Sequence, residues 1–207
     1  KTKILGTQSH IVISTYQGGI ARPDDLERKI MQDPGVIGAA PFILSQGLIS
    51  APGGISGVVI RGIEPASAEK VIRLKEIITQ GSSQNLNESG ILLGSELALR
   101  SGVSVGDAVT VISPTGSMTP LGMIPKSMSF IVRGIFSTGM YEYDSNMVYI
   151  SLEAAQGLFM KDGPSGIEVK VTDIYQADAV AARVMKAIGP GYWAKTWKDM
   201  NMSLFSA

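Results

Sequence analysis

The sequence predicts an α+β fold, and two kinds of pattern support this. Segments rich in β-branched residues, such as 11–16 and 107–113, end at glycines or serines and predict strands. Segments with apolar residues at helical spacing, such as 177–188, predict amphipathic helices. The chain also has 24 glycines and only 17% charged residues, which is typical of a fold with many tight turns.

The predicted elements divide the chain into two end pieces and a strand-rich middle. Strands are expected at 11–16, 36–49, 57–62, 107–113, 129–136, 147–150, 166–172 and 192–198. Helices are expected at 24–31, 95–100, 152–159 and 177–188, a further helix within 65–81, and a polar loop at 80–88. The end pieces are predicted to form one subdomain and the middle an insertion. The termini would then lie close together, which suits a domain inserted between two membrane helices.

Composition excludes several classes of protein. Lysine plus arginine equals aspartate plus glutamate, at 18 each, so no net charge favours a nucleic acid as partner. The absence of cysteine excludes disulfides, thiol catalysis and cysteine-based metal sites. No run of about 18 apolar residues exists to span a bilayer. The start at Lys1 and the apolar run 203–207 are interpreted as cuts from a longer protein.

No pattern in the chain predicts catalysis, a cofactor or a metal ion. His10 is the only histidine and is expected to be a structural residue at the surface or at a strand edge. The glycine-rich run 53–57 has the wrong spacing for a nucleophile elbow and predicts a turn. No phosphate-binding loop is present. Glu142 and Asp144 are expected in a solvated loop, since no further metal ligands follow them.

The segment 113–130 is the main anomaly of the sequence. It joins two predicted strands, yet it is much longer than the usual hairpin loop of about two to five residues. Its apolar residues are unexpected for a solvated loop: Met118, Leu121, Met123 and Ile124. Three prolines would stiffen it and would oppose pairing with other strand edges: Pro114, Pro120 and Pro125. The pattern leaves two possibilities open: the segment binds a partner, or it packs its apolar groups on its own domain.

Residues 118–125, Met-Thr-Pro-Leu-Gly-Met-Ile-Pro, closely resemble the hook of the lipoprotein-releasing permeases LolC and LolF. Residues 3–11 and 196–207 resemble the segments that leave the first membrane helix and enter the second. Residues 94–111 resemble a signature shared by MacB-like periplasmic domains. The segment 170–180 is similar to LolE, and together with the hook it favours the LolF type over LolC.

The resemblance implies a discontinuous two-part fold. The fold would be that of a MacB-like periplasmic domain. A Porter-like subdomain would comprise 8–65 and 146–200, and an inserted, strand-rich Sabre-like subdomain would comprise 66–145 and carry a protruding β-hairpin hook at 113–128. The chain would be the periplasmic domain of a multi-pass inner-membrane ABC permease, without catalytic activity of its own. ATP hydrolysis would take place on a separate LolD-type subunit.

The resemblance also implies partners and a binding site. The permease would pair with a second subunit, either the same chain or LolE-like, and would extract lipoproteins and pass them to a LolA-like chaperone on the hook. The chaperone-binding residues would be Met118, Thr119, Pro120, Leu121, Gly122, Met123, Ile124, Pro125 and Lys126. The family has a basic pad beside its hook, where this chain has Ser127 and Met128, so only Lys126 is carried over.

Two other functions remain as alternatives at this point. A MacB-type exporter domain would contact an envelope adaptor protein, and a hook packed flat on the domain would favour it. A hydrolase would need a nucleophile motif, which the sequence lacks.

Overall fold

A computed structural model describes residues 8–16 and 18–201 of the chain. The parts of 3–11 and 196–207 that lie before residue 8 or after residue 201 are outside the described residues. Contacts between Cα atoms divide the chain into two compact units. The first unit comprises 1–42, 66–73 and 162–207, and the second comprises 43–65 and 74–161.

The first unit contains four antiparallel strands in the order β10, β1, β9, β2. Their bounds are Tyr192–Thr196 for β10, Ile11–Thr15 for β1, Gly166–Val171 for β9 and Val36–Ala51 for β2. Only the part of β2 up to Phe42 belongs to this unit, because the strand continues into the second unit.

Helices and alternating strand residues build the core of the first unit. The helices are α2 (Pro23–Met31), α3 (Pro65–Ile72), α8 (Ala177–Ile188) and α9 (Trp197–Met200), with a 3₁₀ turn η1 at Ile174–Gln176. The odd-numbered residues of β9 pack with apolar residues of α2 and α8 in one buried cluster. The even-numbered Glu168 and Lys170 are also buried, and the Lys170 Nζ donates to the carbonyl of Val71 on α3 (3.2 Å).

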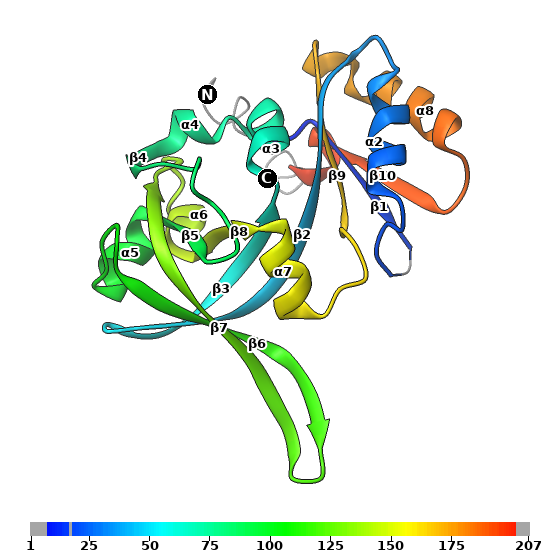
Figure 1. Cartoon of the computed structure of the whole chain (residues 1–207). Coiled ribbons are helices and arrows are strands. Elements are labelled where there is room, and N and C mark those ends of the chain that lie inside the picture. Colours follow the sequence, from blue (N-terminus) through cyan, green and yellow to red (C-terminus); the bar gives the residue numbers. More distant parts are fainter. Residues whose placement is uncertain (1–7, 17, 202–207) are drawn as a thin grey trace. The chain divides into compact units, whose positions relative to one another are not determined.

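The second unit is built around a mixed sheet (Figure 1). Its strand order is β2, β3, β8, β5, β7, β4, and β6 pairs with both β2 and β7. The pairs β3–β8 and β5–β7 are parallel, whereas β2–β6, β4–β7, β5–β8 and β6–β7 are antiparallel. The bounds are Gly54–Ile63 (β3), Ile78–Gly81 (β4), Gly90–Gly94 (β5), Ala108–Thr119 (β6), Gly122–Phe136 (β7) and Met147–Ser151 (β8).

Four helices accompany this sheet: α4 (Leu74–Ile77), α5 (Ser95–Ser101), α6 (Tyr141–Asn146) and α7 (Leu152–Phe159). Two of them, α5 and α7, contribute residues to the separate buried cluster of the sheet. The side-chain oxygen of Ser151 accepts from the amide of Ala154 and caps the start of α7. Ala155 and Leu158 of α7 are fully buried in the cluster, together with Phe130 of β7. The helix α7 is therefore firmly attached to the sheet.

The structure confirms a mixed fold with a large sheet and corrects several elements. The helix predicted within 65–81 is two short helices followed by β4, with Arg73 at a positive φ of 48° between the helices. The strand β5 was not predicted, because all five of its residues are buried and the pattern does not alternate. Residues 141–146 form α6 rather than a loop.

The compact units follow different boundaries from the predicted subdomains. Residues 43–65 and 146–161 belong to the second unit, whereas the prediction grouped them with the chain ends. The reason is strand pairing: β3 pairs with β8, and β8 pairs with β5. Within the described residues, no helix is long and apolar enough to cross a membrane.

Candidate interaction site on the β6–β7 hairpin

The anomalous segment 113–130 forms the outer part of a β-hairpin, whereas its length and prolines by themselves indicated a loop. The strands β6 and β7 pair from Ala108–Ile131 to Thr119–Gly122, with a single register shift on the way. Figure 1 shows this two-stranded ribbon extending beyond the rest of the second unit. The prolines indicated a loop, but Pro114 lies at the register shift and Pro120 in the turn, where the ladder needs no amide donor.

The tip of the hairpin is a tight turn formed by Pro120 and Leu121. The hydroxyl of Thr119 donates to the carbonyl of Gly122 (2.8 Å) and accepts from the amide of Leu121 (3.3 Å). Proline fixes its own φ near −65°, and Gly122 takes a φ of 114° that side chains disfavour. These residues hold Leu121 at the outermost point of the ribbon.

A bulge interrupts the ladder below the tip. Ser113 pairs with Lys126 and Gly116 pairs with Pro125, so β6 has two extra residues between these pairs. The Ser113 hydroxyl accepts from the amide of Thr115 (3.2 Å) and lies 2.8 Å from the Thr115 hydroxyl. Gly116 is required here, because a Cβ at this position would collide with the carbonyl oxygen of Ile124.

The bulge sets which residues share a face of the outer ribbon. Directly paired residues lie on the same face of a hairpin, so Met118 and Met123 lie together and Pro125 lies on their side. Ile124 and Lys126 lie on the opposite face. Further along β7 that opposite face carries residues of the core, including Phe130. We call the face with the two methionines the free face and the face that continues along β7 to Phe130 the core-side face, although Met123 and Ile124 are equally exposed in the outer ribbon.

The exposure of the tip bears on one of the two possibilities that the sequence left open, the packing of the apolar groups on their own domain. Leu121 is 97% exposed and Met118 is 80% exposed, while Met123 and Ile124 are both 56% exposed. The segment therefore does not pack its apolar groups on its own domain. Apolar side chains gathered at the end of an ordered ribbon are typical of a protein–protein contact.

Lys126 differs from the other predicted contact residues, because its ammonium group is already engaged. The Lys126 Nζ donates to the carbonyl oxygen of Gly157 in the last turn of α7 (2.7 Å). The nine predicted residues thus lie together on the hairpin, with eight in its outer part and Lys126 beside the bulge.

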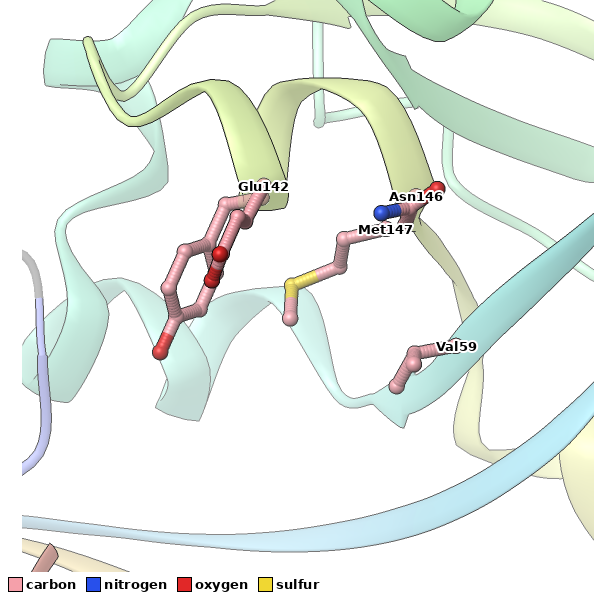
Figure 2. A pocket seen from close by; sticks show the side chains of 5 residues that line it. Val59, Glu142, Asn146 and Met147 are labelled. Atoms are coloured by element: carbon pink, nitrogen blue, oxygen red, sulfur yellow. The ribbon is translucent and has the colours of Figure 1, made fainter. Parts of the chain in front are cut away.

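A second candidate site is a shallow cavity of about 300 Å³ between α6 and β3. Figure 2 shows Glu142, Asn146 and Met147 at α6 and its end, with Val59 on β3 nearby. Tyr143 completes the lining. No sequence pattern predicts this cavity, because its residues come from separate elements. Its lining combines three polar side chains, Glu142, Tyr143 and Asn146, with the apolar Val59 and Met147, so it could hold a small group of mixed polarity.

The titratable residues considered from sequence have structural roles. His10 is buried rather than at the surface, and its Nδ1 accepts from the amide of Val171 (3.2 Å). Asp144 is buried as well, whereas Glu142 is exposed. Among the described residues, no group of three or more His, Cys, Asp or Glu side chains could hold a metal ion.

The fold and the hairpin agree with the similarity of the chain to known proteins. The family model of the MacB-like periplasmic core domain matches residues 3–187, and the chain belongs to this family. Within the family it is a LolC/LolE-type periplasmic domain. A LolC protein of Neisseria meningitidis, named a lipoprotein-releasing system transmembrane protein, is 34% identical over 177 residues, or 84% of this chain and 43% of the relative.

Further relatives and solved structures are consistent with this family. A LolC of Xylella fastidiosa is 35% identical over 209 residues, covering 100% of this chain and 50% of its own length. The chain thus spans about half the length of these curated relatives. The extracellular domain of the transporter YknZ from Gram-positive bacteria superimposes with a TM-score of 0.60 at 12% identity, covering 90% of this chain and 99% of that one. The periplasmic region of MacB from Actinobacillus actinomycetemcomitans gives 0.57 at 11% identity, covering 100% and 97%.

Proposed function

We propose that this chain is the periplasmic part of an ABC-transporter permease that extracts lipoproteins from the inner membrane and passes them to a LolA-like chaperone. The exposed apolar tip of the β6–β7 hairpin carries the proposal. Leu121 and Met118 have no packing partner on their own domain that would explain their apolar character. The relatives named as lipoprotein-releasing proteins support a role in lipoprotein release, and the resemblance of residues 118–125 to the hook supports the chaperone as the partner of the tip.

The docking surface would be the free face of the hairpin together with its tip. Met118 and Met123 offer flexible, polarizable side chains, which adapt to an apolar groove. Pro120 and the bonds of Thr119 fix the backbone before binding, which reduces the entropy lost on association. The hairpin thus fits a partner with a concave apolar surface, as expected of a carrier of acyl chains.

In this proposal the other subunits of the transporter are separate proteins. The permease works with a LolD-like ATPase, so ATP is hydrolysed elsewhere and this domain is not catalytic. The second permease subunit is LolE-like, or another copy of this chain if the protein is of LolF type. Co-purification of tagged and untagged full-length copies distinguishes these two assemblies. In this proposal the first unit corresponds to the Porter-like subdomain and the second to the Sabre-like subdomain.

The test is calorimetric binding of the purified domain to the LolA-like chaperone of the same bacterium. Pro120→Glu and Leu121→Glu place a charge at the tip, and each is expected to weaken binding by about 2 kcal/mol or more, roughly thirtyfold. Ile55→Glu is the matched control, because Ile55 is an exposed apolar residue of the separate β2–β3 hairpin. Unchanged binding by folded tip variants would exclude the hairpin as the chaperone site.

The main alternative is a MacB-type exporter domain that contacts an envelope adaptor. Similarity to the MacB periplasmic region concerns the fold alone, at 11% identity. A hairpin packed flat on the domain would have favoured this alternative, but Leu121 and Met118 are exposed. The lipoprotein-releasing function is therefore the better supported of the two.

A further inference from the structure

The bulge separates the outer ribbon from the inner part of the hairpin. On β6, residues 114 and 115 have no cross-strand partner between the pairs Ser113–Lys126 and Gly116–Pro125, so the pairs of residues 116–125 are offset from the inner ladder. Such a short two-stranded ribbon gains little stability by itself. Its orientation relative to α7 and the sheet therefore depends on contacts at the bulge.

Lys126 makes such a contact at this position. It pairs with Ser113, the last residue before the bulge, and its Nζ donates to the carbonyl oxygen of Gly157 (2.7 Å). Lys126 and Ile124 lie on the core-side face of the ribbon. The bond therefore joins this face to α7.

The acceptor is well suited to a cation. In a continuing helix the amide of Lys161 would donate to Gly157, but it donates to the carbonyl of Gln156 instead (3.0 Å), and Met160 ends the helix with a φ of 52°. The carbonyl of Gly157 thus belongs to the last turn of α7, where partial negative charge accumulates. Because α7 is capped by Ser151 and anchored in the core, the bond joins the ribbon to a rigid element.

We propose that Lys126 is a positioning residue that holds the core-side face of the outer ribbon toward α7 and leaves the Met118–Met123 face free for the partner. This differs from the expectation that Lys126 contacts the chaperone directly. The tether itself is independent of the partner, whereas its consequence for docking rests on the proposed function.

The absence of cysteine allows the tether to be measured directly. Spin labels at Ser117→Cys on the ribbon and Glu153→Cys on α7, both exposed positions, report the distance between the two elements. In the Lys126→Met variant, which keeps an unbranched side chain but removes the donor, we expect the distance distribution to broaden about twofold. Lys126→Arg keeps a donor and should restore the narrow distribution.

The control is Lys161→Met, which removes one exposed charge just after α7 without removing the tether. It should leave the distance distribution unchanged, and the urea midpoint should be the same for all variants. A Lys126→Met distribution as narrow as that of the wild type would overturn the proposal. Equal broadening in Lys161→Met would also overturn it, because the loss of a positive charge near α7, and not the loss of the Lys126–Gly157 bond, would then explain the broadening.

Binding measurements with the purified LolA-like chaperone test the positioning role of Lys126 separately from the docking site at the tip of the hairpin. The tether predicts that Lys126→Met weakens binding about fivefold, with slower association, and that Lys126→Arg rescues it. If Leu121→Glu abolishes binding and Lys126→Met leaves it unchanged, the positioning role is wrong while the docking site stands. If neither variant affects binding, the proposed function fails, and the distance measurement alone decides whether the tether exists.

Discussion

At the scale of single residues, Asp144 shows how a buried carboxylate organises a turn. Its two carboxylate oxygens accept from the amide (2.7 Å) and hydroxyl (2.8 Å) of Thr138, the amide of Gly139 (3.2 Å) and the hydroxyl of Ser137 (3.3 Å). Hydrogen bonds to a charged acceptor are stronger than neutral ones. Asp144 therefore fixes the turn that leads from β7 into α6.

Replacing Asp144 by alanine should destabilise the protein strongly. The variant removes a buried carboxylate and with it four hydrogen bonds to part-buried or exposed donors of Ser137, Thr138 and Gly139, so we expect the free energy of unfolding to fall by about 3 kcal/mol. Urea unfolding followed by circular dichroism measures this loss. Glu142→Ala, at an exposed position of the same helix, should change stability by less than about 0.5 kcal/mol. Equal losses in both variants would contradict the structural role of Asp144.

Asp33 and Arg183 form a paired contact in the first unit with a defined pH dependence. Arg183 donates from Nε (2.8 Å) and Nη2 (2.9 Å) to the Asp33 carboxylate. These bonds lower the pKa of Asp33 below its ordinary value, partial burial opposes the shift, and the amide of Gly35 adds to the lowering. An acid with a lowered folded pKa stabilises the fold above its unfolded pKa of about 4, and this stabilisation is lost as the pH falls through the folded pKa.

The variant Arg183→Met should therefore be less stable than the wild type at pH 7 but not in strong acid. We expect the difference in thermal midpoint to shrink as the pH is lowered from about 5 toward about 2, because protonated Asp33 no longer gains from the arginine. Lys186→Met, on the same helix α8, serves as control and should show no such convergence. A midpoint difference that is constant with pH would rule out the ion pair as its cause.

At the scale of elements, the sequence predicted most strands and helices, and its errors have physical reasons. The strand β6 was expected to end at Ser113, because Pro114, Gly116 and Pro120 together indicate a loop. Sequence alone cannot reveal that Pro114 lies in a bulge and Pro120 in the turn, so that the strand continues on both sides of the bulge. The candidate residues were nonetheless identified, since exposed apolar residues between prolines are unusual in either conformation. The bond from Lys126 to Gly157 joins residues far apart in the sequence, so no local pattern could predict it.

Gly116 controls the register of the outer ribbon, which makes it a test at this scale. A valine side chain at this position would meet the carbonyl of Ile124 and the Cα of Pro125, so the pairs of the outer ribbon should separate. Hydrogen exchange of the amides in 117–124 should accelerate in Gly116→Val, while the urea midpoint of the second unit stays unchanged. Ser117→Val, at the next and exposed position, should leave this exchange unchanged. If the amides in 117–124 exchange as slowly in Gly116→Val as in the wild type, the outer ribbon accommodates the valine side chain and keeps its pairs.

At the scale of the whole molecule, each unit has a separate core although neither is one continuous stretch of chain. The buried cluster of the second unit lies entirely within 43–159. That of the first unit lies within 11–39 and 167–184. The helix α3 interrupts the second unit in sequence but is assigned to the first, where Val71 accepts from Lys170. The two cores therefore depend on different parts of the chain.

This separation predicts that residues 43–161 fold by themselves and retain the hairpin. The fragment keeps its whole core. It also contains α3, which loses its contacts with the rest of the first unit, so we expect a cooperative urea transition at a lower midpoint than in the full chain. In the fragment, Phe130→Ala removes a fully buried ring and costs about 3–5 kcal/mol, which should abolish the transition. If the fragment shows no cooperative transition, the second unit requires the first to fold. If it folds, it offers the smallest protein on which the hairpin can be tested for chaperone binding.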